Sequence, residues 1–122
     1  MSLIFVIDDS PTMVMSLSRI LAKYGYSVET ATNGQDGLKR LKGGMKPNLI
    51  LTDINMPEMD GITFIKEARK HAPTRFTPIV VLTTESVATK QSEARSAGAS
   101  GWLTKPTQPD DLIATIRQLL PA

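Results

Sequence analysis

This chain of 122 residues lacks several features on which other protein classes depend. It contains no cysteine, which excludes disulfides, thiolate nucleophiles and cysteine-based zinc or iron–sulfur centres. No apolar run approaches the roughly 18 residues of a membrane-spanning helix, and the N-terminus lacks the basic and apolar segments of a signal peptide. We therefore expect a cytoplasmic protein that is not inserted in a membrane.

Aromatic residues and net charge are also scarce. Aromatic residues make up 5% of the chain, and 14 Lys and Arg against 12 Asp and Glu leave a formal charge of +2. This small surplus and the scattered basic residues argue against direct binding of nucleic acid. The content of 41% hydrophobic and 21% charged residues is ordinary for a globular protein. The length fits a single domain over residues 1–122.

Short strand-like segments alternate with amphipathic helical patterns along the chain. Continuous apolar runs or β-branched residues predict strands at 3–7, 26–30, 49–52, 79–82 and 102–104. Each is followed by a predicted helix, and apolar residues recur at helical spacing in the first, third and last of these helices. Five strands and five helices in alternation imply a parallel sheet with helices on both faces. We therefore expect the α/β class and a three-layer α/β/α sandwich.

Local signals predict where several helices begin. Ser10 followed by Pro11 is a typical N-cap and first helical residue, and Asp60 can cap a later helix. Thr107 and Asp110 have the spacing of a capping box, with Asp in place of the preferred Glu. This pair predicts that the last helix begins just after Thr107.

Polar residues follow four of the predicted strands at the point where each strand ends. Asp8 and Asp9 follow the first strand, Asp53 the third, Thr83 the fourth and Lys105 the fifth. Because the carboxyl ends of parallel strands meet at one edge of a sheet, we expect these side chains to converge in one polar site.

Such a site needs additional positive charge. Three carboxylates cannot all stay ionised at close range without compensation, and Lys105 still leaves an excess of about two negative charges. Ligands that are all oxygen favour Mg²⁺, with Mn²⁺ tolerated. A carboxylate beside Mg²⁺ can attack phosphorus and become an aspartyl phosphate. Asp53 is the predicted phosphoacceptor, Asp8 and Asp9 are predicted metal ligands, and Thr83 and Lys105 are placed to bind phosphoryl oxygens.

The chain resembles the receiver (response regulator) domain of two-component signalling over almost its whole length. The run 9–13 resembles chemotaxis-type stand-alone regulators most. The resemblance implies a flavodoxin-like sheet of order 2-1-3-4-5. The matching segments are Asp8-Asp9-Ser10, Asp53-Ile54-Asn55-Met56-Pro57-Glu58-Met59-Asp60-Gly61, Leu82-Thr83-Thr84, Ala97-Gly98-Ala99 and Lys105-Pro106.

The resemblance implies a phosphorelay role for individual residues. Asp53 would accept a phosphoryl group from a histidine kinase or phosphotransfer protein, and the backbone carbonyl of Asn55 would complete the Mg²⁺ shell formed with Asp8 and Asp9. The Lys105–Pro106 peptide bond would be cis. Such domains promote their own phosphorylation and dephosphorylation and are not otherwise enzymes.

A conformational switch is also implied by the resemblance. Thr83 would move toward the phosphoryl group, and Trp102 would rotate into the space it leaves, although Trp is bulkier than the usual Tyr or Phe. Asn55 and Glu85 would tune the lifetime of the phosphoryl group. The partner-binding face would be the fourth helix, fifth strand and fifth helix, about 87–97 and 102–119. The domain would be a monomer or a phosphorylation-dependent dimer.

Two other functions remain open from the residues. An aspartyl-phosphate hydrolase of the haloacid dehalogenase type needs a second Asp two residues after Asp53, where this chain has Asn55. A flavin-binding carrier of the same fold needs a first loop that holds a phosphate, which Asp8 and Asp9 would repel.

Overall fold

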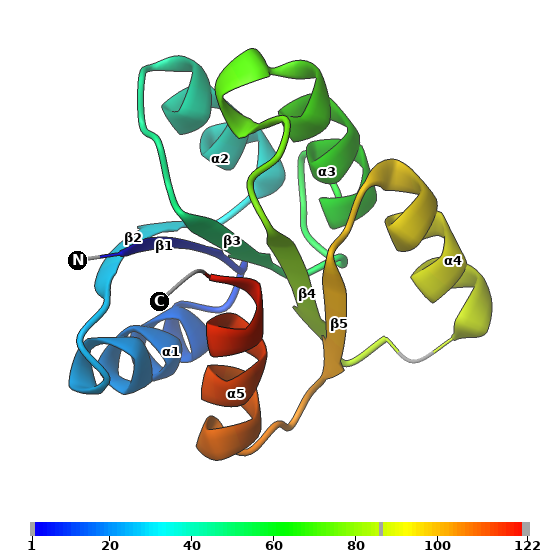
Figure 1. The fold of residues 1–122 in the computed structure, drawn as a ribbon. Coiled ribbons are helices and arrows are strands. Elements are labelled where there is room, and N and C mark those ends of the chain that lie inside the picture. Colours follow the sequence, from blue (N-terminus) through cyan, green and yellow to red (C-terminus); the bar gives the residue numbers. More distant parts are fainter. Residues whose placement is uncertain (1, 86, 121–122) are drawn as a thin grey trace.

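The computed structural model describes residues 2–85 and 87–120, and their strands and helices alternate throughout (Figure 1). Two layers of helices enclose one sheet. A short 3-10 helix, η1 (Ala72–Thr74), follows the third helix. The main elements are β1 (Leu3–Ile7), α1 (Pro11–Lys23), β2 (Ser27–Ala31), α2 (Gly34–Lys42), β3 (Leu49–Thr52), α3 (Gly61–Lys70), β4 (Ile79–Thr83), α4 (Ala88–Ala97), β5 (Gly101–Thr104) and α5 (Pro109–Leu119).

The five strands form one parallel sheet in the order β2-β1-β3-β4-β5. This confirms the predicted architecture and strand order. Ile7 pairs with Thr52, and Thr52 pairs with Val81. The strands therefore end nearly level with one another, so the residues that follow them lie along one carboxyl edge.

Both faces of the sheet are buried, which explains the continuous apolar runs in the sequence. Successive residues of β1 alternate between two cores. Phe5 and Ile7 belong to the core under α2, α3 and α4, whereas Ile4 and Val6 belong to the core under α1 and α5. A strand placed in this way has no polar face, so its polar residues appear only where it ends.

Side-chain caps set the start of three helices. Ser10 Oγ accepts a hydrogen bond from Met13 N at 3.3 Å, and Asp60 Oδ1 accepts one from Thr63 N at 2.8 Å. Asn33 Oδ1 accepts one from Asp36 N at 2.7 Å at the start of α2. The caps at Ser10 and Asp60 confirm the prediction from sequence.

The predicted capping box at Thr107 is wrong. The helix α5 begins at Pro109, and its N-cap is Gln108, whose side chain makes no capping hydrogen bond. The proline ring fixes φ in the helical range and removes an N–H that would be unpaired at this position. Pro109 therefore determines where α5 begins, and Thr107 lies outside the helix.

The helices are short, and they differ in how firmly they are packed. The helix α3 buries five residues, whereas α4 buries only Ala94, and its N-cap Val87 makes no side-chain capping hydrogen bond. Packing of apolar side chains supplies most of the stability of a short helix, so α4 is held less firmly than α3. No helix within the described part of the chain has the length and hydrophobicity needed to cross a lipid bilayer.

Candidate functional site

The acidic residues after β1 and β3 are fixed by the sheet itself. Asp53 N donates to Ile7 O at 3.0 Å, and Asp8 N donates to Ala31 O at 3.1 Å. These bonds continue the strand pairing by one residue beyond each strand. Asp8 is 2% exposed and Asp53 is 8% exposed. The backbone therefore holds two buried carboxylates side by side at the carboxyl edge.

Lys105 joins these two carboxylates. Its Nζ lies 2.6 Å from Asp8 Oδ2 and 2.9 Å from Asp53 Oδ2, and its side chain is 11% exposed. The backbone N of Lys105 donates to Thr83 O at 2.7 Å, which extends β5 along β4. The following Lys105–Pro106 peptide bond is cis. Residues separated by 97 and 52 positions thus meet in one small site, as expected from the alternating pattern.

The charge of Lys105 is stabilised by these contacts. Burial by itself lowers the pKa of Lys105, but the hydrogen bonds to Asp8 and Asp53 and the charges of both carboxylates outweigh burial. The pKa is therefore raised above its ordinary value of 10.5. Lys105 remains a cation at neutral pH and neutralises part of the charge of the acidic cluster.

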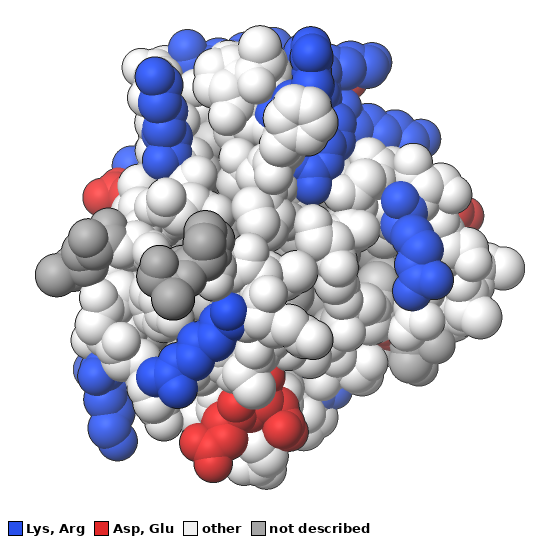
Figure 2. All heavy atoms as spheres, viewed as in Figure 1, with Lys and Arg blue, Asp and Glu red and all other residues white. Residues whose placement is uncertain are grey.

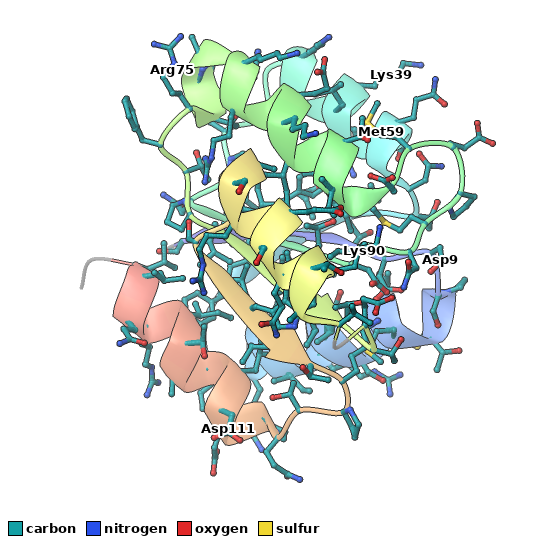
Figure 3. The ribbon with its side chains drawn as sticks, turned by 90° about the vertical axis from the view of Figure 1, so that its right-hand side faces the viewer. Asp9, Lys39, Met59, Arg75, Lys90 and Asp111 are labelled. Carbon is teal, nitrogen blue, oxygen red and sulfur yellow. The ribbon has the colours of Figure 1, made fainter. Side chains whose placement is uncertain are left out.

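A third carboxylate joins the cluster from the solvent side. Asp9 is exposed, and Asp8, Asp9 and Asp53 each offer one oxygen such that these atoms lie within 4.8 Å of one another. Figure 3 shows Asp9 at this edge of the molecule, beside the start of α1. Three carboxylates against one ammonium leave an excess of negative charge. The all-oxygen donor set fits a hard cation such as Mg²⁺.

The remaining oxygens of the two buried acids are oriented by backbone N–H groups. Asp8 Oδ1 accepts from Ser10 N at 3.0 Å, and Asp53 Oδ1 accepts from Ile54 N at 2.6 Å. Asn55 N lies 3.4 Å from Asp53 Oδ1, and Asn55 is exposed. The loop after β3 thus curls around the Asp53 carboxylate, and Asn55 borders it.

The structure does not bring Thr83 into direct contact with the ion pairs. Thr83 is fully buried at the end of β4, and its Oγ1 accepts a hydrogen bond from Glu85 N at 3.2 Å. Glu85 Oε1 in turn accepts from Val87 N at 3.3 Å. The Thr83 hydroxyl therefore belongs to the loop between β4 and α4. Its contact with a phosphoryl oxygen stays a prediction.

Trp102 lies away from the acidic cluster. It pairs with Val81 in the sheet and packs against the core under α2, α3 and α4. Its indole Nε1 is buried and has no hydrogen-bond partner among residues 2–85 and 87–120. It lines a cavity of about 40 Å³ between α4 and β5, together with Gln91 and Ala94.

Gly61 was not singled out by its chemistry, yet it shapes the site. A Cβ atom at Gly61 would lie 2.1 Å from Asp53 O and 2.8 Å from Ile54 Cα, so a larger residue would push the start of α3 away. Gly61 N also donates to Ile54 O at 2.8 Å. The sequence did offer a signal for this close approach of the backbone, because a glycine stands at the first helical position after the N-cap Asp60, where most helices carry a residue with a side chain.

Comparison with known proteins assigns the family. Residues 4–117 match the response regulator receiver domain model. The chain is 36% identical to Protein PilH of Pseudomonas aeruginosa over 120 residues, covering 98% of each chain. It is 35% identical to Chemotaxis protein CheY of Thermotoga maritima over 117 residues, covering 95% of each.

A solved structure of chemotaxis protein CheY4 of Vibrio cholerae superimposes with a TM-score of 0.93 at 38% identity, covering 98% of this chain and 99% of that one. Other curated relatives are longer, and the chain spans only 15% of one and 50% of another. The family model, the near-full-length relatives and the shared fold establish that this chain belongs to the response regulator receiver domain family.

Proposed function

We propose that the chain is a phosphoacceptor switch of a two-component phosphorelay, with Asp53 as the phosphorylated residue. The observation that carries the proposal is the ammonium of Lys105, which lies within hydrogen-bond distance of both Asp53 and Asp8. A fixed cation beside a nucleophilic carboxylate stabilises the negative charge of a phosphoryl group while it is being transferred. The phosphoryl donor is the phosphohistidine of a histidine kinase or of a phosphotransfer protein.

Asp53 suits the acceptor role better than its two acidic neighbours. Asp8 is 2% exposed, and its two oxygens are held by Ser10 N and Lys105 Nζ. Asp9 is exposed and has no hydrogen bond to Lys105. Both oxygens of Asp53 also accept hydrogen bonds, from Ile54 N and Lys105 Nζ, but at 8% exposed it is the more accessible of these two buried carboxylates.

The reaction transfers one phosphoryl group between two nucleophiles. An oxygen of Asp53 forms the bond to phosphorus while the bond from phosphorus to the imidazole nitrogen of the donor breaks, and that nitrogen keeps the electron pair. Lys105 pairs with a phosphoryl oxygen, and Thr83 contacts another after its hydroxyl leaves Glu85 N. Water later attacks the phosphorus atom, the bond from phosphorus to the Asp53 oxygen breaks, and the free carboxylate and inorganic phosphate result. Apart from this phosphorylation and dephosphorylation, we propose no enzymatic activity.

Asp8, Asp9 and Asp53, with the backbone carbonyl of Asn55, would hold Mg²⁺, and Mn²⁺ would be tolerated. Bound there, the ion would neutralise the negative charge of the phosphoryl oxygens. The carboxylate cluster supports this assignment, since its oxygens lie within 4.8 Å of one another. Asn55 N lies 3.4 Å from Asp53 Oδ1, and Glu85 N donates to Thr83 Oγ1. These contacts support the tuning of the lifetime of the phosphoryl group that we assign to Asn55 and Glu85.

The output would be a change in the face formed by α4, β5 and α5, which a downstream protein partner recognises. The weak packing of α4 supports this choice, because only Ala94 of α4 is buried. Thr83 and Trp102 would couple the site to that face. We propose that the chain is a monomer or a phosphorylation-dependent dimer. We also propose a cytoplasmic location.

The family membership removes support from the hydrolase and flavin-carrier alternatives.

Phosphorylation with a small-molecule donor tests the acceptor directly. We expect acetyl phosphate and Mg²⁺ to add one phosphoryl group to the intact chain, measured by mass spectrometry under mild conditions. Asp53→Asn should abolish the label because the amide is a poor nucleophile. Asp60→Asn is the matched control, since Asn preserves the helix cap. Undiminished labelling of the Asp53→Asn variant would place the acceptor on another residue.

A further inference from the structure

Basic residues that are scattered in the sequence gather at one end of the folded molecule. Three lie in the last turn of α2 and two in the last turn of α3, and two more lie in the loops that follow these helices. Figure 2 shows Lys and Arg side chains along the upper rim, over the ends of α2 and α3, and acidic side chains at the bottom of the same face. This cationic end consists of Lys39, Arg40, Lys42, Lys46, Arg69, Lys70 and Arg75.

Arg75 of the cationic end is remote from the phosphoacceptor edge. In Figure 3 it lies at one end of the layer formed by α2 and α3, whereas Asp9 lies toward the opposite end of the sheet and Lys39 lies on the outer side of the α2 layer. Cations near helix C-termini are favoured by the helix dipole. That effect explains the residues within the last turns of α2 and α3, but not those in the loops beyond.

Some of these cations already have partners, and others do not. Arg40 pairs with Glu29, and Lys70 pairs with Glu67 at 3.1 Å. Arg69 donates to backbone carbonyls. Within the cationic end, the exposed residues that form no ion pair with another described residue are Lys39, Lys42, Lys46 and Arg75. Their charge is available to a partner.

A hollow of about 170 Å³ lies between the end of α2 and η1. Its lining includes the basic residues Lys42 and Lys46 and the apolar residues Leu41 and Met45. A hollow lined by apolar surface and by residues with positive charge fits a projecting apolar side chain that is flanked by carboxylates.

Phe76 lies in the loop that leaves this hollow and is 90% exposed. Arg69 Nη1 donates to three carbonyls of this loop, Thr74 O at 2.8 Å, Arg75 O at 3.2 Å and Thr77 O at 2.6 Å. A single exposed aromatic is ordinary on a protein surface. Phe76, however, directly follows the unpaired cation Arg75, and a loop whose backbone is held by Arg69 loses less conformational entropy when it binds than an unrestrained one.

We propose that this end of the molecule docks an acidic segment of a partner protein. The carboxylates of the segment pair with Lys42, Lys46 and Arg75, and an apolar side chain enters the hollow beside Phe76. A bilayer surface offers no side chain to fill a hollow. A nucleic-acid strand needs successive aromatic platforms, and Phe76 is the one strongly exposed aromatic in the described part of the chain. An acidic polypeptide therefore fits best.

A short synthetic peptide in which Glu alternates with Leu is the probe for this surface. We expect the intact chain to bind it, measured by fluorescence anisotropy of a label on the peptide. Lys42→Glu with Lys46→Glu should weaken binding about tenfold or more, because two attractions become repulsions. The matched control is Arg19→Glu with Lys23→Glu, which changes the net charge equally on exposed residues of α1 and should leave affinity within about twofold.

Phe76→Ser should weaken binding severalfold, whereas Met15→Ser, at another exposed apolar residue, should not. Asp53→Asn should bind the peptide like the parent chain, so the outcome is independent of the phosphoacceptor assignment. Equal losses in the two double variants would show attraction to net charge alone and overturn the proposal. Binding to phosphatidylglycerol vesicles or to a single-stranded oligonucleotide, without binding to the peptide, would also overturn it.

Discussion

Lys105 is the residue on which the acidic edge of the sheet depends, because one ammonium group contacts two buried carboxylates. Removing one partner from a buried ion pair leaves the other charge uncompensated. This lowers the stability of the folded protein more than replacing both charged residues by apolar ones would. The position of Lys105 was predictable from its place after the last apolar strand. The direction of the Thr83 hydroxyl was not, because it depends on the Glu85 N–H, whose position is set by the loop and not by strand periodicity.

Lys105→Ala should lower the free energy of unfolding of the Mg²⁺-free protein by about 3 kcal/mol. Urea unfolding in the presence of a chelator measures this change. Lys90→Ala, which removes an exposed ion pair of 3.7 Å with Glu93, should cost less than about 1 kcal/mol. Similar losses in the two variants would contradict the importance assigned to burial.

The contribution of Lys105 should also depend on pH. Its pKa is raised in the folded protein, so its stabilising effect is complete below the ordinary value of 10.5 and is lost as the pH rises through the raised value. The difference in unfolding free energy between the parent chain and Lys105→Ala should be constant near neutral pH and fall only in strong alkali. A difference that declines near neutral pH would mean that the pKa is lowered.

Among the secondary-structure elements, strands buried on both faces were predicted within about one residue of their ends. The 26–30 segment shifted by one, to Ser27–Ala31, because a partly polar edge strand lacks a sharp apolar boundary. The helix η1 was not predicted. It depends on Thr74, whose Oγ1 donates to Ala68 O at 2.6 Å, and on Arg69, contacts that form only after α3 has packed.

The helix α4 should open more readily than α3. Its weak packing and the missing side-chain cap at Val87 reduce the free energy of local unfolding. Native-state hydrogen exchange should show lower protection for the amides of α4 than for those of α3, which buries five residues. Ala94→Gly should lower the protection of α4 further, because glycine loses the one buried methyl group and weakens the helix. Equal protection of α3 and α4 would contradict this view.

The whole molecule carries its charges at separate places, with carboxylates crowded at the carboxyl edge and cations beyond the ends of α2 and α3. The acidic cluster was predictable because parallel strands align their carboxyl ends. The cationic end was not, because it depends on how α2 and α3 lie side by side. In the sequence those residues are only scattered positions, from which we argued against nucleic-acid binding without recognising a cationic surface.

Crowded carboxylates should set how the molecule responds to metal. Asp9→Asn should raise the melting temperature in chelator, because it removes a repelling charge, and should reduce the further rise that Mg²⁺ gives. Asp111→Asn, at an exposed residue of α5 away from the cluster, is the charge-matched control and should leave the Mg²⁺ effect unchanged. Differential scanning fluorimetry measures both. A Mg²⁺ response unaltered by Asp9→Asn would remove Asp9 from the ligand set.

The buried indole nitrogen of Trp102 has a spectroscopic consequence. It belongs to the sole tryptophan of the chain, so all tryptophan emission arises from the space between α4 and β5. We expect this emission to shift to longer wavelength when a movement of α4 exposes the indole to water. The protein therefore carries an intrinsic optical sensor of α4 movement, readable without any attached dye.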